Sequence, residues 1–135
     1  FVSCYNASIM SDNANKINVE ILPAYLAEQS DPSNDHYVFS YTVTIRNEGK
    51  KSARLLTRHW VITDGDGQVQ EVRGEGVIGE QPHLSPGEDF KYTSGTFMNT
   101  PVGTMRGSYQ MITDSGEIFE ADIPIFTTAV PNTLH

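Results

Sequence analysis

A strict two-residue alternation of side-chain polarity dominates this sequence and limits the folds open to it. In residues 37–46, all five odd positions are apolar or aromatic, and the even positions after Val38 are Ser, Thr, Thr and Arg. Successive side chains of a β-strand point to opposite faces, so the pattern predicts a strand with one buried and one solvated face. The same alternation recurs in residues 17–21, 105–111 and 119–125.

Turn-forming residues separate the alternating segments. Glycine-containing clusters at 47–50, 64–67 and 114–116 lie between them, where glycine can take the positive φ that a tight turn needs. We expect seven strands, at about 17–26, 36–46, 54–63, 68–73, 88–95, 104–113 and 117–127. No segment of 12 or more residues shows helical periodicity. Short strands at this spacing indicate an all-β sandwich or barrel.

The single tryptophan favours a sandwich over a small barrel. Trp60 lies in the third predicted strand, as in an immunoglobulin-like or fibronectin type III-like β-sandwich of about seven antiparallel strands. With one cysteine the chain has no intrachain disulfide, so packing must hold the sheets together. Alternation predicts that Leu56 shares the buried face of Trp60, and that Leu55 and His59 share the opposite face. Arg58, on the Trp60 side, should extend to solvent or pair with an acid.

Length and charge exclude several functions. A chain of 135 residues has room for one domain. Acidic residues outnumber basic residues by 17 to 9, and the formal net charge of −8 disfavours generic binding to nucleic acids or anionic lipids. The sequence contains no apolar run of about 18 residues that could span a membrane. It also begins with no secretory signal pattern, so we expect a cytoplasmic protein.

The beginning of the chain differs from the rest. Met10 precedes a polar tract that suits a native start, so we interpret Phe1 to Ile9 as non-native or upstream residues and Cys4 as incidental. We expect residues 1–16 to be a disordered or non-native segment. Residues 17–135 then form the β-sandwich domain.

A glycine motif after the fourth predicted strand is the main candidate for ligand binding. Residues 74–79 read GEGVIG, which fits the GxGxxG pattern, but two prolines in residues 80–87 prevent the helix that dinucleotide binding requires. We therefore favour a glycine-rich loop that crosses between sheets. The alternative is a backbone concavity that holds a phosphate compound, with a divalent cation to offset the two acidic residues. Its candidate residues are Gly74, Glu75, Gly76, Gly79 and Glu80.

Other chemistry has little support in the sequence. Asp64, Asp66 and His83 are the remaining candidates for a metal site, but the aspartates lie in an Asp-Gly-Asp-Gly segment that a hairpin turn explains better. The histidines lack the close spacing of a zinc site. The sequence has no nucleophile elbow of the G-x-S-x-G type. We do not expect an enzyme.

Several ungapped segments match a known family. They are YVFSYTVTIRN (37–47), LLTRHWVIT (55–63), VRGEGVIGEQP (72–82), LSPGE (84–88), YTSG (92–95), TPVGTMRG (100–107) and IPIF (123–126). These segments closely resemble the bacterial ApaG family, also known as CorD, and the resemblance covers about residues 17–135.

The resemblance implies a fold and a role. The family has a fibronectin-like sandwich, and is linked by phenotype to cobalt resistance and magnesium efflux, and by gene neighbourhood to diadenosine tetraphosphate hydrolysis. Its domain also occurs in eukaryotic F-box and polymerase-interacting proteins, as a protein-interaction module. The resemblance therefore implies a non-enzymatic module that binds proteins and could form a homodimer. The alternative is binding of a divalent cation, pyrophosphate or a dinucleoside polyphosphate at the glycine loop.

Overall fold

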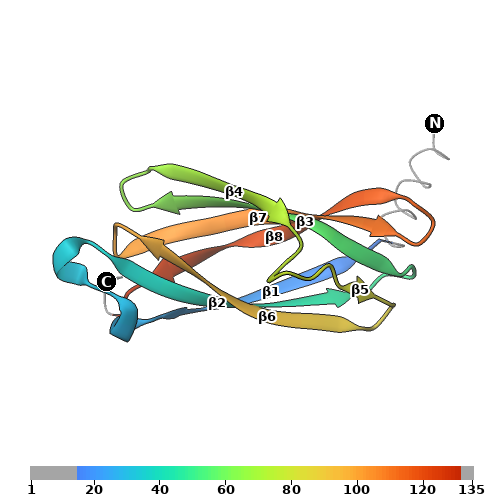
Figure 1. Ribbon diagram of the computed structural model, residues 1–135, viewed down its shortest axis with the longest axis horizontal. Coiled ribbons are helices and arrows are strands. Elements are labelled where there is room, and N and C mark those ends of the chain that lie inside the picture. Colours follow the sequence, from blue (N-terminus) through green and yellow to red (C-terminus); the bar gives the residue numbers. More distant parts are fainter. Residues whose placement is uncertain (1–14, 132–135) are drawn as a thin grey trace, which may run out of the picture.

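Antiparallel β-strands account for nearly all regular structure in the computed structural model, which describes residues 15–131 (Figure 1). Seven strands coincide with those that the alternation predicts, and a two-residue strand, β5, is additional. Two short 3₁₀ helices, η1 (Ala27–Gln29) and η2 (Pro32–Asn34), join β1 to β2. The strands in this part of the chain are β1 (Ile17–Tyr25), β2 (Tyr37–Asn47), β3 (Ala53–Asp64), β4 (Val69–Glu75), β5 (His83–Leu84), β6 (Asp89–Met98), β7 (Val102–Thr113) and β8 (Ile118–Ala129).

The strands form two sheets that pack face to face. The smaller sheet has the order β1-β2-β6, and the larger has the order β4-β3-β7-β8 with β5 paired to the start of β3. Every pairing between strands is antiparallel. In Figure 1 the larger sheet lies above the smaller one, and β1 lies along β8 at one side. The fold is therefore an all-β sandwich of the immunoglobulin or fibronectin type III kind, as the sequence predicts.

Trp60 lies at the centre of the core between the sheets, as expected. Its side chain is 3% exposed. The ring of Tyr41, from the facing sheet, lies 5.1 Å from it between centroids, and the ring of Phe126 lies 6.0 Å away, both edge-on. Edge-to-face aromatic contacts of this kind add to the burial of apolar area. The indole thus joins three strands from both sheets.

A β-bulge in β3 makes one sequence-based assignment wrong. Leu55 pairs with Met111 and Thr57 with Gln110, so Leu56 is an extra residue in the ladder. The extra residue reverses the alternation on its N-terminal side. Leu55 is therefore in the core at 0% exposure, whereas Leu56 is only partly buried and does not share the buried face of Trp60.

Asn47 is a buried polar residue that ties together the loops at one end of the sandwich. It is 1% exposed. Its Nδ2 donates to the carbonyl oxygens of Lys51 and Leu84, at 2.8 and 2.9 Å, and its Oδ1 accepts from the N–H of Gly49 at 2.9 Å. A buried amide that satisfies all these bonds fixes the three segments relative to one another.

The two ends of the chain lie outside the described residues. They include Phe1, Cys4 and Met10. The interpretation of the beginning of the chain therefore concerns residues outside the described range. Asn15 and Lys16 are described: Asn15 Nδ2 donates to Glu117 Oε1 at 2.9 Å, and the carbonyl of Lys16 accepts from the N–H of Glu48 at 2.8 Å. Between residues 15 and 131, no helix has the length and apolarity needed to cross a membrane.

Candidate functional site

The glycine motif forms the end of β4 and a tight hairpin turn. Gly74 and Glu75 are the last residues of β4. Val77 and Glu80 then exchange two backbone hydrogen bonds, of 2.8 and 2.9 Å, around Ile78 and Gly79, which both have positive φ (44° and 80°). This is the pattern of a two-residue turn of type I′. No helix begins after the turn, as the prolines predict. The short strand β5 follows and pairs with β3 of the same sheet, so the loop does not cross between sheets as expected from the sequence.

Arg58 holds this segment from the inner side. Its Nη1 donates to the carbonyl oxygens of Glu75 and Gly76, both at 2.9 Å. Arg58 remains partly exposed, and its hydrogen-bond acceptors are backbone carbonyls rather than the acidic side chain that the sequence offered as one alternative. Because β4 ends beside it, two backbone carbonyl oxygens are within reach of the guanidinium.

Packing restricts substitution at two glycines of the motif. A Cβ on Gly74 would lie 2.7 Å from the guanidinium carbon of Arg58, which is closer than side-chain atoms approach. Gly76 has a φ of 61°, and a Cβ there would collide with the carbonyl of Glu80. The structure thus gives both glycines a reason that involves no ligand.

The loop offers few free N–H groups to an anion. The N–H of Gly76 donates to the carbonyl of Leu56, the bulged residue of β3, at 2.8 Å. The N–H groups of Val77 and Glu80 are used within the turn. An anion-binding concavity needs successive N–H groups that point outward together. Of the five candidate residues, Glu75 faces a groove described below, while Gly79 and Glu80 lie at the exposed turn.

The three metal-site candidates do not come together. Asp64 ends β3 and Asp66 lies in the turn that follows, whereas His83 pairs with Arg54 near the opposite end of that strand. Asp64 Oδ1 accepts from the N–H groups of Asp66 and Gln68, at 2.9 and 3.0 Å, as a turn residue does. His83 instead contacts Asp114 at 2.8 Å. Within residues 15–131, no group of three His, Cys, Asp or Glu residues could hold a metal ion.

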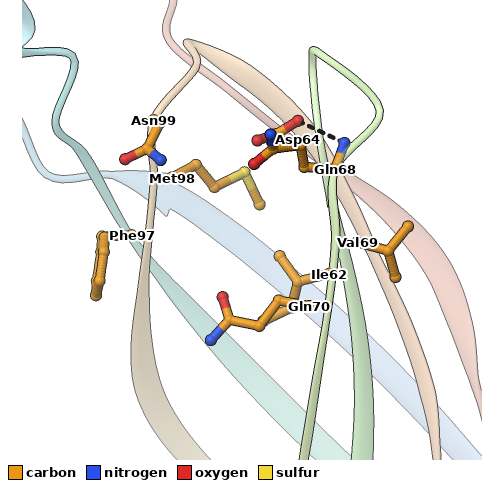
Figure 2. Close-up of a pocket in the computed structure, with 8 residues that line it drawn as sticks. All are labelled: Ile62, Asp64, Gln68, Val69, Gln70, Phe97, Met98 and Asn99. Carbon is orange, nitrogen blue, oxygen red and sulfur yellow. Dashed lines mark hydrogen bonds between the residues drawn. The ribbon is translucent and has the colours of Figure 1, made fainter.

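A small pocket opens at the side of the sandwich between β4 and β6 (Figure 2). The end of the β3–β4 hairpin forms one wall, and the end of β6 forms the other. The apolar side chains Val69 and Phe97 are 62% and 60% exposed here. Its volume of about 120 Å³ is well below that of typical small-molecule sites, roughly 300 Å³ or more. The pocket is lined by Ile62, Asp64, Gln68, Val69, Gln70, Phe97, Met98 and Asn99.

A wider groove crosses the outer face of the larger sheet. Its volume is about 420 Å³, and its polar side chains come from β3, β4, β7 and β8. The strand pairing places His59 between Arg73 on β4 and Ser108 on β7. Charges of both signs therefore stand side by side on rigid strands. The groove is lined by Thr57, Arg58, His59, Arg73, Gly74, Glu75, Ser108, Gln110 and Glu120.

The charges at the β4 side of this groove are held in place. His59 Nε2 donates to Glu71 Oε1 at 2.7 Å, and Arg73 lies 3.7 Å from the same oxygen. The hydrogen bond from His59, with the positive charges of Arg73 and Arg106, lowers the pKa of the Glu71 carboxyl below its usual value. Glu71 is thus ionised at neutral pH. The sequence pattern alone does not reveal this cluster, because only the register of three strands brings its members together.

Comparisons with known proteins agree with the architecture. The ApaG domain model matches residues 27–113. Protein ApaG of Thiobacillus denitrificans is 61% identical over 120 residues, which cover 89% of this chain and 94% of that protein. Protein ApaG of Dechloromonas aromatica is 55% identical over 127 residues, with 93% and 100% covered.

Solved structures show the same fold. The crystal structure of a Bordetella pertussis protein given the name ApaA has a TM-score of 0.87 and 51% identity, and the match covers 90% of this chain and 98% of that one. An X-ray structure of a second structural-genomics target has a TM-score of 0.85 and 48% identity, with 92% of each chain covered. The chain therefore belongs to the ApaG family.

Proposed function

We propose that this ApaG-family protein is a non-enzymatic binding module, and that it contacts other proteins through the outer face of its larger sheet. The observation that carries the proposal is the groove on that face. It extends over four strands and presents polar side chains of both charges. A polar and charged lining of this kind fits the side chains of a protein partner, whereas small-molecule sites are lined mostly by apolar side chains.

The charges of the groove suit selective contacts. Arg73 stands near Glu75 on one side, and Glu120 faces the groove from β8. Because these residues lie on strands that the core holds firmly, little backbone freedom is lost when a partner binds. A partner with complementary charges would be steered to this face, in a protein whose net charge of −8 repels acidic surfaces in general.

The relatives support a binding role only in general terms. The similar proteins carry the name ApaG, which refers to no reaction. Family resemblance adds the use of this domain as an interaction module in larger proteins. We further propose that the family's links to cobalt resistance and magnesium efflux arise from such a contact with another protein.

The test is capture of partners by paired surface variants. The full chain is immobilised, and partners from a lysate of the native organism are identified and their affinities measured. Glu120→Arg reverses a charge in the groove, and Glu20→Arg makes the same change on the outer face of the smaller sheet. We expect Glu120→Arg to weaken binding by about tenfold or more and Glu20→Arg to leave it unchanged. Equal effects of the two variants, or no partner, would contradict the proposal.

The glycine loop remains a second candidate site, for a divalent cation with pyrophosphate or a dinucleoside polyphosphate. Its geometry gives it less support, because three loop N–H groups already have backbone partners. Calorimetry of the wild-type chain with magnesium, cobalt, pyrophosphate and a dinucleoside tetraphosphate addresses it directly. Saturable heat that Glu80→Gln reduces would support the loop. The absence of heat at millimolar ligand would remove this candidate.

A further inference from the structure

We infer that a second copy of this chain pairs with β4, antiparallel and about a twofold axis at Val72, so that the two larger sheets join into one. The inference rests on the proposed function, because it assigns one partner to the binding module. It concerns the exposed side of β4, which is the outermost strand of the larger sheet and lies at the upper edge of Figure 1.

The hydrogen-bond pattern shows which residues of β4 point outward. Gly76 donates to the opposite residue Leu56 at 2.8 Å, and Asp64 donates to the opposite residue Gln68 at 3.0 Å. In an antiparallel ladder the residues that bond to a neighbour alternate with those that do not. Even-numbered residues of β4 therefore bond to β3. The residues that direct N–H and C=O groups away from β3 are Val69, Glu71, Arg73 and Glu75.

These outward groups allow β4 to pair with itself in a register that matches its charges. When the twofold axis passes through Val72, Glu71 stands opposite the partner's Arg73, and Arg73 stands opposite the partner's Glu71. Both belong to the outward set, so the two residues of each pair exchange backbone hydrogen bonds. Opposite charges directly across a ladder stabilise the pairing.

Neighbouring registers are unfavourable. A shift of two residues in one direction places Glu71 opposite the partner's Glu71. A shift in the other direction places Arg73 opposite the partner's Arg73, and Glu71 opposite the partner's Glu75. Like charges in these positions repel, so both neighbouring registers are less favourable than the one centred at Val72.

The inward side of β4 fits the same arrangement. Val72 is partly buried and packs against the edge of the core. At the twofold axis it would meet the partner's Val72 in a non-hydrogen-bonded pair, where cross-strand side chains come closest. An apolar contact would thus lie beneath the two charged pairs, on the opposite face of the joined sheet.

The other outer strands lack this self-complementarity. The charged residues of β8 are Glu120 and Asp122, which carry the same sign. Pro23 interrupts β1, and the two charged residues of β6, Asp89 and Lys91, lie together at one end of the strand. Among the outer strands of the described residues, β4 is the one that places opposite charges symmetrically about its centre.

Charge exchange in the full chain tests the inference. Sedimentation equilibrium measures the molecular mass of the protein at concentrations from micromolar to millimolar. At the highest concentrations the measured mass should approach twice the 15.0 kDa of a single chain. We expect Glu71→Arg and Arg73→Glu each to weaken the dimer by about tenfold or more. The double variant, which exchanges the two charges, should restore it. Asp89→Arg, which breaks the exposed Arg46–Asp89 ion pair of the smaller sheet, is the matched control and should leave the dimer unchanged.

A cysteine probe tests the register, and the fluorescence of Trp60 confirms that each variant is folded. With Cys4→Ser as the background, Val72→Cys should form a disulfide-linked dimer on mild oxidation, because the two thiols meet at the axis. Gln70→Cys should not, because it faces the partner's Gly74.

Three outcomes would overturn the inference: a monomer at all concentrations, a double variant as weak as the single ones, or equal oxidation of the two cysteine variants. If the chain is a monomer but still binds other proteins through its groove, the self-pairing is wrong while the proposed function stands. If the dimer forms but the groove contacts no other protein, the self-pairing stands while the proposed function of the groove is wrong.

Discussion

The phenol oxygens of Tyr92 and Tyr109 lie 2.6 Å apart in the middle of the sandwich. Tyr92 belongs to β6 of the smaller sheet and Tyr109 to β7 of the larger, so this buried hydrogen bond links the two layers. Both side chains are almost fully buried, and the chain has only one cysteine. The bond thus provides a specific polar link between sheets that no intrachain disulfide can join.

Removal of one hydroxyl from this pair should destabilise the protein. Tyr109→Phe or Tyr92→Phe leaves the other hydroxyl buried without its partner, and each should lower the free energy of unfolding by about 1–3 kcal/mol. The double variant should cost less than the sum of the two, because neither hydroxyl then remains unpaired. Urea unfolding followed by Trp60 fluorescence measures these values. If the loss in the double variant equals the sum of the two single losses, the hydrogen bond between the hydroxyls does not contribute to stability.

The same pair should make the protein sensitive to alkali. Burial raises the pKa of Tyr92 to about 12 and raises that of Tyr109 further. In the unfolded chain both phenols ionise near their usual value of about 10. Since the folded-state pKa is the higher one, the stabilisation is complete below pH 10 and is lost as the pH rises through 12.

Unfolding free energies measured from pH 8 to pH 12 check this prediction. The wild type should lose stability above pH 10, with a smaller slope in the Tyr92→Phe/Tyr109→Phe double variant. Equal slopes in the two proteins would mean that other groups cause the alkaline loss.

Substitution at the glycine motif should affect folding through Arg58. Gly74→Ala places a methyl group against the Arg58 guanidinium, and we expect a loss of about 1–3 kcal/mol. In an Arg58→Ala background the same substitution should cost clearly less, because the obstacle is gone. Gly95→Ala in β6 is the control, since its new Cβ would lie 3.5 Å from the carbonyl oxygen of Phe39, an ordinary contact distance. An unchanged cost in both backgrounds would contradict this explanation.

Asn47 should be among the most sensitive polar residues of the protein. Asn47→Ala removes three side-chain hydrogen bonds at a buried site and leaves the carbonyls of Lys51 and Leu84 without that donor. We expect a loss of about 2–4 kcal/mol. Asn99→Ala, at an exposed position, should change the stability by less than about 0.5 kcal/mol. Thermal unfolding of the two variants side by side distinguishes these effects, and similar midpoints would refute the role of Asn47.

Local patterns in the sequence predict most strands and the core of this fold, but few of its polar side-chain contacts. Alternation in residues 37–46 predicts β2, and the position of Trp60 predicts the core, because both follow from side chains that point alternately to two faces. Leu55 and Leu56 were assigned to the wrong faces, since a bulge adds a residue to one strand and leaves no mark in the alternation.

The groups around the candidate sites depend on contacts between distant residues. The bonds from Arg58 to the end of β4 and the contact of His59 with Glu71 require the register of β3 and β4. A pairing register is a property of two strands together, and the sequence of one strand does not specify it. The glycine motif is the opposite case. Its local pattern suggested a ligand site, whereas the packing of the strands is enough to explain its glycines.

Site-specific photo-crosslinking in cells tests the binding role most directly. A photoreactive amino acid replaces Gln110 in the groove of the larger sheet, and in a matched strain it replaces Thr42 on the outer face of the smaller sheet. Mass spectrometry then identifies the adducts formed on irradiation. We predict adducts with protein partners from position 110 and none from position 42. Adducts from position 42 alone, or from neither position, would contradict the account.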